Sequence, residues 1–204
     1  MPNKSQSVAL VAALFIFTRC GIGPASPLSA AAARGDLAVL DGLLAAGSSS
    51  EERGEALISA VRNGQPAAIE VLVKAGADPN ITAGVNGWTV LMHAVHKNEP
   101  ESVRALIKAG ADINARVGKG MTALIMAAGY GYTDIVRMLL DAGAEGHAAV
   151  RDGSNALDFA LNGVADIDRF TWGTCQAETV KLLRRRVPDL KPRYSFDLKK
   201  CVAE

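Results

Sequence analysis

Apolar residues recur along most of the chain at helical spacing, in short runs that end at glycines. In the stretch 133–142, for example, Ile135, Val136, Leu139 and Leu140 fall three or four residues apart and define one apolar face. The pattern predicts short amphipathic helices. None of them could bury its apolar face alone, so we expect their stability to come from stacking on one another.

The helical pattern repeats at a nearly constant interval. One marker is a leucine that is followed three residues later by alanine, and successive markers are 29, 34, 33 and 33 residues apart. A second marker is a glycine at the end of a helical run. Such a period is the signature of a repeat architecture. The leucines are Leu28, Leu57, Leu91, Leu124 and Leu157, and the glycines are Gly47, Gly76, Gly110 and Gly143.

The repeating unit also carries helix-end signals. Gly143, Gly110 and Gly76 come just after second helices, where a left-handed residue ends a helix at little cost. Thr89 and Thr122 precede first helices and are expected to cap their free N–H groups. Small residues such as Ala127 and Ala128 occupy the centres of first helices, which lets neighbouring units approach closely.

The best-formed unit, residues 120–145 (GMTALIMAAGYGYTDIVRMLLDAGAE), resembles the ankyrin repeat, and residues 87–114 resemble it nearly as well. The resemblance covers roughly residues 26–186. It implies an all-α solenoid of about five helix-turn-helix units with short hairpin loops and degenerate terminal repeats. One departure is that no unit has Thr-Pro-Leu-His: after Thr89 and Thr122 the proline and histidine are replaced by Val90 or Ala123 and by Met92 or Ile125.

We expect units near residues 26–50, 51–81, 82–115, 116–147 and 148–186. The fifth unit carries an insertion at 162–175 between its two helices, and residues 187–204 form a non-repeat tail. Insertions in repeat arrays map to loops on one face, and that face is often functional.

Residues 1–25 have the pattern of a signal peptide. Lys4 precedes an unbroken apolar run at 8–17, which as a helix would be about 15 Å long, too short to span a bilayer. Small residues at 23–25 suggest cleavage after Ala25, and export to the periplasm or outside the cell. A buried N-terminal helix, an uncleaved anchor and a lipoprotein acylated at Cys20 remain as alternatives. Arg19 stands where a lipobox has a small residue.

Export gives the other two cysteines a role. Cys175 closes the insertion and Cys201 lies near the end of the tail, and two cysteines in an oxidising compartment can pair. We expect a Cys175–Cys201 disulfide. It would hold the tail over the exposed side of the last unit, with Tyr194, Phe196 and Leu198 covering that side.

Composition and motifs argue against catalysis. With 22 basic and 21 acidic residues, the net charge of +1 provides no global field for nucleic acid or anionic membranes. No phosphate loop, Gly-x-Ser-x-Gly or Cys-x-x-Cys occurs. His93 and His96 lie three residues apart, but no third ligand is near in sequence. The unit's phase predicts His93 near the packed side and His96 at the exposed edge. We expect no metal and no cofactor.

Ankyrin arrays bind partners through hairpin tips and the starts of the inner helices, which form a concave strip. The resemblance therefore implies a partner-binding strip in which Trp88 and Tyr130 are exposed aromatic anchors. The strip consists of Arg62, Asn63, Trp88, His96, Lys97, Met121, Tyr130 and Ser154.

The sequence thus predicts a monomeric, non-catalytic protein-binding module of the periplasm or cell envelope. Exported bacterial ankyrin proteins are sometimes encoded beside a toxin that they neutralise or an oxidative-stress enzyme, so an accessory role of either kind is implied. Two other hypotheses stay open: an enzyme with its site in the 162–175 insertion and the tail, and a lipid-anchored structural protein of the envelope.

Overall fold

The computed structural model of the protein describes residues 26–163, 173–194 and 201. Over these residues, helices that are consecutive in sequence pack together as five pairs. In chain order the helices are α2 (Pro27–Arg34), α3 (Leu37–Ala45), α4 (Ser50–Arg62), α5 (Pro66–Lys74), α6 (Val90–His96), α7 (Pro100–Lys108), α8 (Ala123–Tyr130), α9 (Thr133–Asp141), α10 (Ala156–Asn162) and α11 (Ala177–Arg186).

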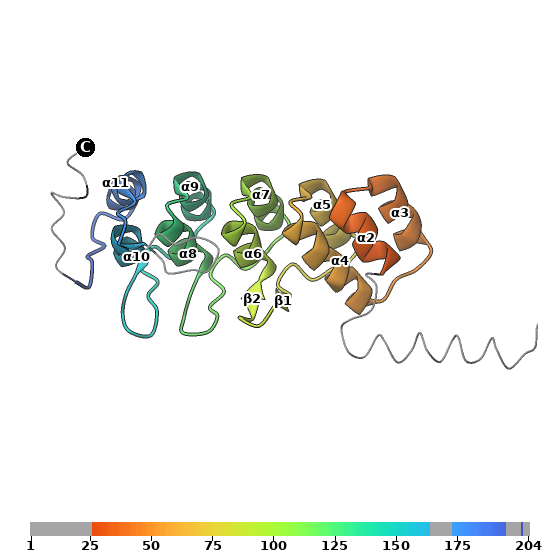
Figure 1. The fold of residues 1–204 in the computed structure, drawn as a ribbon, viewed down its shortest axis with the longest axis horizontal. Coiled ribbons are helices and arrows are strands. Elements are labelled where there is room, and N and C mark those ends of the chain that lie inside the picture. Colours follow the sequence, from red (N-terminus) through yellow and green to blue (C-terminus); the bar gives the residue numbers. More distant parts are fainter. Residues whose placement is uncertain (1–25, 164–172, 195–200, 202–204) are drawn as a thin grey trace, which may run out of the picture.

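The five pairs stack into an elongated array of two rows (Figure 1). The first helices of the pairs (α2, α4, α6, α8 and α10) form an inner row, and the second helices form an outer row. The predicted all-α solenoid is confirmed. In the described part of the chain, no helix combines the length and the apolar character needed to cross a bilayer.

Loops project from one side of the array, below the inner row in Figure 1. The loop before α6 contains a two-stranded antiparallel hairpin of β1 (Thr82–Ala83) and β2 (Trp88–Thr89). Single bridges, Val117 to Met121 and Ala149 to Asn155, mark the same turn in the next two units. Only a few residues join α3 to α4, so this junction has no room for a hairpin, in line with the shorter first spacing of the leucine markers.

The helix ends follow the sequence signals. The hydroxyls of Thr89 and Thr122 accept the backbone N–H groups of Met92 and Ile125, each at 3.3 Å, which confirms the expected caps. Asn155 caps α10 in the same way, and the Asp158 carboxylate accepts the Asn155 backbone N–H in return. The four marker glycines all adopt positive φ angles: 100° for Gly47, 93° for Gly76, 86° for Gly110 and 93° for Gly143.

The marker leucines and the small residues of the inner row form the core. All five leucines are at most 5% exposed, and Ala31, Ala60, Ala94, Ala127 and Ala160 are fully buried. Because alanine has almost no side-chain volume, α2 and α4, and likewise α8 and α10, pack closely along their lengths. The hydrophobic stabilisation of each unit therefore depends on its neighbours.

Asparagine side chains link the second unit to the third and the third to the fourth. Asn80 Oδ1 accepts the backbone N–H of Asp112 at 2.7 Å, and Asn114 Oδ1 accepts that of Glu145 at 2.8 Å. In the next unit His147 occupies the equivalent position and its Nε2 lies 3.1 Å from Asp189 in the tail. Side-chain contacts between successive units thus continue into the tail.

The start of the tail folds back over the last unit. Val187 and Leu190 are each 8% exposed, and the Asn155 side chain donates to the Lys191 carbonyl at 2.8 Å. Tyr194, expected to cover the apolar side of this unit, is instead 50% exposed, because the covering is done by the two aliphatic side chains before it. Phe196 and Leu198 lie outside the described residues.

Candidate functional site: two pockets on the hairpin side of the array

One pocket lies where the β1–β2 hairpin meets the C-terminal ends of α4 and α6. We call it the Trp88 pocket, and its volume is about 360 Å³. It therefore spans two consecutive units. The lining residues are Arg62, Asn63, Ala83, Gly84, Val85, Asn86, Trp88, His93, His96 and Lys97.

The structure gathers five members of the predicted strip in this pocket, namely Arg62, Asn63, Trp88, His96 and Lys97. The other three do not line the pocket. Met121 pairs with Val117 in the next hairpin and Tyr130 lies behind His96, whereas Ser154 lines a second pocket in the last unit. Binding of a partner by these residues stays a prediction.

A chain of aromatic rings forms the back of the Trp88 pocket. The Trp88 ring centroid lies 5.1 Å from that of His96, whose ring is 5.7 Å from Tyr130. His96 Nδ1 and the Tyr130 hydroxyl are 3.1 Å apart, a hydrogen bond between neighbouring units. Tyr130 stacks on Tyr132 at 5.3 Å. The hydrogen bond and ring packing hold Trp88 on a rigid support.

The predicted exposure of His96 and Tyr130 is wrong, as these side chains are only 9% and 8% exposed. Trp88 from the hairpin covers His96 on one side, and Tyr130 from the next unit covers it on the other. The sequence of α6 alone cannot reveal this burial, because both covering side chains come from outside this helix. Trp88 itself is half-buried.

His93, placed by the sequence on the packed side, is a half-buried wall of the pocket. Its Nε2 lies 3.0 Å from the Ala83 carbonyl oxygen, which ties α6 to the hairpin. Burial lowers the pKa of His93, and the positive charges of Arg62 and Lys97 lower this pKa further, against the opposing effect of the Ala83 hydrogen bond. The three-residue spacing between His93 and His96 was the only feature of the sequence that pointed to a place for His93 in the pocket wall.

Two cations, Arg62 and Lys97, stand at the pocket with exposed side chains. Gly84, at φ 74°, lies beside the Arg62 guanidinium: a Cβ added there would be in ordinary van der Waals contact, 3.9 Å from Arg62 Nη2 and 3.7 Å from His93 Cε1. The described lining contains no Asp or Glu, and neither cation forms an ion pair within the part of the chain that the structure describes.

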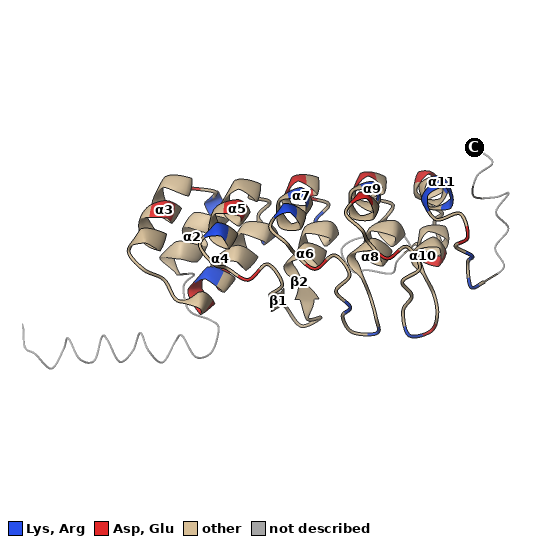
Figure 2. Ribbon diagram, turned by 180° about the vertical axis from the view of Figure 1, so that it is seen from behind, with Lys and Arg blue, Asp and Glu red and all other residues tan. Residues whose placement is uncertain are grey.

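Away from the pocket, positive and negative charges lie together on the outer helices (Figure 2). The outer helices α7, α9 and α11 carry both signs, and α6 and α8 of the inner row carry no Lys, Arg, Asp or Glu. The pocket thus lies where the uncharged helix α6 meets the two cations Arg62 and Lys97.

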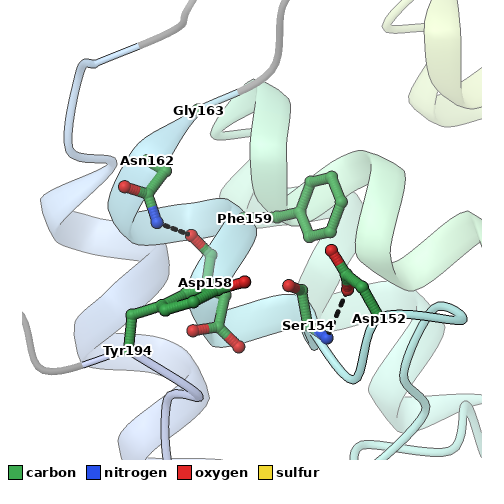
Figure 3. Close-up of a pocket in the computed structure, with 7 residues that line it drawn as sticks. All are labelled: Asp152, Ser154, Asp158, Phe159, Asn162, Gly163 and Tyr194. Carbon is green, nitrogen blue, oxygen red and sulfur yellow. Dashed lines mark hydrogen bonds between the residues drawn. The ribbon is translucent and has the colours of Figure 1, made fainter.

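A second pocket, the Tyr194 pocket, lies at the last unit and also measures about 360 Å³. It is bounded by the third hairpin loop, α10 and the tail (Figure 3). Its described lining consists of Asp152, Ser154, Asp158, Phe159, Asn162, Gly163 and Tyr194.

Both carboxylates of the Tyr194 pocket are held by the chain itself. Asp158, 3% exposed, accepts the backbone N–H of Asn155 at 3.0 Å and that of Arg193 at 2.8 Å. Asp152 accepts the Ser154 backbone N–H at 2.8 Å, which is the main reason its pKa is lowered, and lies 3.5 Å from the Arg193 guanidinium. These groups connect the tail to the last unit.

The Tyr194 pocket is also where an enzymatic site in the insertion or tail would be sought. Neither histidine nor cysteine is present in its described lining, so Ser154 has no such base beside it. Most of the insertion, residues 164–172 with Asp166 and Asp168, lies outside the described residues. The geometry of this pocket favours a structural role for its carboxylates.

The two ends of the insertion lie together. The Gly173 N–H donates to the Asn162 carbonyl at 2.6 Å, and the Gln176 N–H donates to that of Ala160 at 2.8 Å. Next to them the Cα atoms of Cys175 and Cys201 are 5.6 Å apart, within the range that a disulfide can bridge.

His93 and His96 both line the Trp88 pocket. Over residues 26–163, 173–194 and 201, no three His, Cys, Asp or Glu side chains converge as a metal site would require.

Stacked helix pairs with projecting hairpins and a pocket on the hairpin side define a helical-repeat binding protein. The sequence matches the family of ankyrin repeats (3 copies) over residues 28–117 and 57–152, more than half of the chain. The chain belongs to the ankyrin-repeat family. No curated protein matches it. Members of this family are generally non-enzymatic modules that bind other proteins, and α10 and α11 extend the array beyond the matched residues.

Proposed function

We propose that the protein binds a partner protein through the Trp88 pocket and the adjoining hairpin edge, in the periplasm or cell envelope. The observation that carries this proposal is the convergence of five strip residues from two units on one pocket with an aromatic floor. An accessory role beside a toxin or an oxidative-stress enzyme is compatible with this kind of binding.

Trp88 has the properties of an interface anchor. Its ring is half-buried, held against His93 at 5.6 Å and His96 at 5.1 Å, and still forms part of the pocket wall. A large side chain that is already ordered loses little conformational entropy on binding, which is why such residues are common hot spots. At the hairpin tip, Val85 is fully exposed and offers an apolar contact beside the pocket.

The experiment compares Trp88→Ala with a matched control, Val39→Ala. Val39 is an apolar residue on α3 of the outer row, 44% exposed, far in sequence from the pocket. Immobilised protein would capture partners from a bacterial envelope extract, and the partner identified by mass spectrometry would then be purified and titrated calorimetrically. We expect Trp88→Ala to weaken its affinity by about 2 kcal/mol or more, and Val39→Ala to leave it unchanged. Equal affinities for both variants would place the binding surface elsewhere.

Export is proposed from the signal-peptide pattern of residues 1–25. The intact mass of protein recovered from an envelope fraction tests it, and removal of the first 25 or so residues is expected. A full-length cytosolic product would contradict export, whereas a diacylglycerol adduct on Cys20 would establish the lipoprotein alternative. Light scattering of the mature protein tests the expected monomer.

We also propose the Cys175–Cys201 disulfide, which the 5.6 Å separation of the two Cα atoms supports. In an oxidising compartment, two half-buried or buried cysteines this close are expected to pair. The bond would close a loop with a sequence separation of 26 residues. Loop-closure entropy gives such a bond about 3 kcal/mol of stabilisation. Peptide mapping under non-reducing conditions would find the linked peptides, and two free thiols in periplasmic material would disprove the bond.

A further inference from the structure

We infer that the Trp88 pocket recognises an acidic segment of its partner, one that presents Asp or Glu side chains next to an apolar residue. The inference rests on the proposed function, since it specifies the chemistry of the partner for the same pocket. It follows from the charges at the pocket, from how those charges are compensated, and from the apolar surface beside them.

The charge at the pocket has one sign. Arg62 ends α4 and Lys97 follows α6, and the described lining includes no carboxylate. Glu99 is near in sequence, but its carboxyl group lies against Gly64 and is not part of the lining. Two cations left without an ion pair in the described chain make the pocket complementary to a negatively charged group.

Positive charge continues along the edge that the tips of the next two hairpin loops form. Lys119 and Arg151 are exposed there, and the Arg151 N–H donates to the Lys119 carbonyl at 2.7 Å, which joins the second and third hairpin loops. Two carboxylates in this region are already used: Glu145 pairs with Arg116 at 2.8 Å, and Asp152 lies 3.5 Å from Arg193. Lys119 also helps to lower the pKa of Asp152, so a partner segment running along this edge would meet positive charge that is unpaired in the described chain mainly at Arg151 and at the pocket itself.

Apolar groups beside the cations distinguish this edge from a purely electrostatic surface. Val85 at the hairpin tip is fully exposed and the Trp88 ring forms part of the wall. A hydrophobic side chain next to an acidic one could contact both. Such a combination favours a peptide with mixed acidic and apolar character over a polyanion that presents only phosphates.

The test uses short fluorescein-labelled peptides and fluorescence anisotropy. One peptide is rich in glutamate and leucine, and its isosteric twin has glutamine in place of each glutamate. We expect the mature protein to bind the first peptide and not the second, with an affinity that falls as salt is raised. The double variant Arg62→Ala/Lys97→Ala should lose about tenfold in affinity.

The matched control is Lys74→Ala/Arg137→Ala, which removes the same two types of charge from exposed positions on the outer helices α5 and α9. It should bind the acidic peptide as the unchanged protein does. Circular dichroism and thermal unfolding would establish that both double variants fold.

Three outcomes would overturn the inference: no binding of the glutamate peptide, equal binding of the glutamine twin, or an equal loss in both double variants. A single-stranded DNA oligonucleotide that binds as tightly, with the same dependence on Arg62 and Lys97, would show a general polyanion site instead. Failure of this inference is separable from failure of the proposed function. If the captured partner still depends on Trp88 while the peptides do not bind, the partner surface stands and its acidic character is wrong.

Discussion

The two pockets on the hairpin side are equal in size but use their charged groups in opposite ways. In the Tyr194 pocket, the Asp158 carboxylate accepts two backbone N–H groups and Asp152 is paired with Arg193. In the Trp88 pocket, Arg62 and Lys97 have no ion-pair partner in the described chain. The difference follows from where each pocket lies in the array of helix pairs.

The Trp88 pocket belongs to middle units, which have neighbours on both sides. Their cores are closed by stacking, so the cations Arg62 and Lys97 on their hairpin side are not needed to hold the array together. The last unit has a neighbour on one side only, and its polar groups bind the tail that covers the other side. We therefore propose that the middle of the array serves partner binding, whereas the polar groups of the last unit stabilise its end.

The largest effect is expected at the support of the Trp88 pocket. Tyr130→Ala should lower the free energy of unfolding by about 4 kcal/mol, because it removes a buried ring and leaves His96 without its hydroxyl partner. Tyr130→Phe keeps the ring and should cost about 1 kcal/mol. Urea unfolding followed by circular dichroism measures both, and equal, small losses would show that Tyr130 does not support the pocket.

The next effect concerns the Tyr194 pocket. Asp158→Ala removes the acceptor for the Asn155 and Arg193 N–H groups and should destabilise the last unit by about 3 kcal/mol. Hydrogen exchange should show faster exchange in α10 and α11 with little change in α6. Asp152→Ala, at an exposed position in the same pocket, is the control and should cost much less. Uniform loss of protection along the array would contradict a local role for Asp158.

A smaller, pH-dependent effect is expected from His93. Its lowered pKa means that, below its ordinary value of about 6.5, the unfolded chain takes up a proton that the folded protein does not yet bind. The free energy of unfolding should therefore fall as the pH drops from about 6.5 toward the lower folded-state pKa. In His93→Gln this part of the pH dependence should disappear, which urea titrations across this range would show. Parallel curves for the two proteins would rule out a titration by His93.

The smallest effect on stability is expected at the cations themselves. Arg62→Ala and Lys97→Ala should each change the free energy of unfolding by no more than about 0.5 kcal/mol, because both side chains are exposed and unpaired in the described chain. Thermal unfolding measures this directly. A loss as large as that of Asp158→Ala would mean that the two pockets do not differ in the way proposed.

Much of the site could be located from the sequence, though not its internal arrangement. Arg62, Asn63, Trp88 and Lys97 were placed on the hairpin side because each occupies a defined phase of the repeat. His93 was placed near the packed side but left out of the strip, and His96 and Tyr130 were given the wrong exposure. These errors share a cause: phase shows where a residue lies on its own helix, and not which side chains of other units cover it.

The sequence by itself determined the repeat, the helices, their caps and the order of the units. These features depend on local chemistry: the leucine and alanine spacing, the hydroxyls of Thr89 and Thr122, and the glycines after the second helices of the first four units. Only the tertiary structure decided that Trp88 and Tyr130 enclose His96, that Arg62 lies over Gly84 beside His93, and that the backbone of the tail binds Asp158. Each of these contacts joins residues of different elements, so its geometry exists only once the units have stacked.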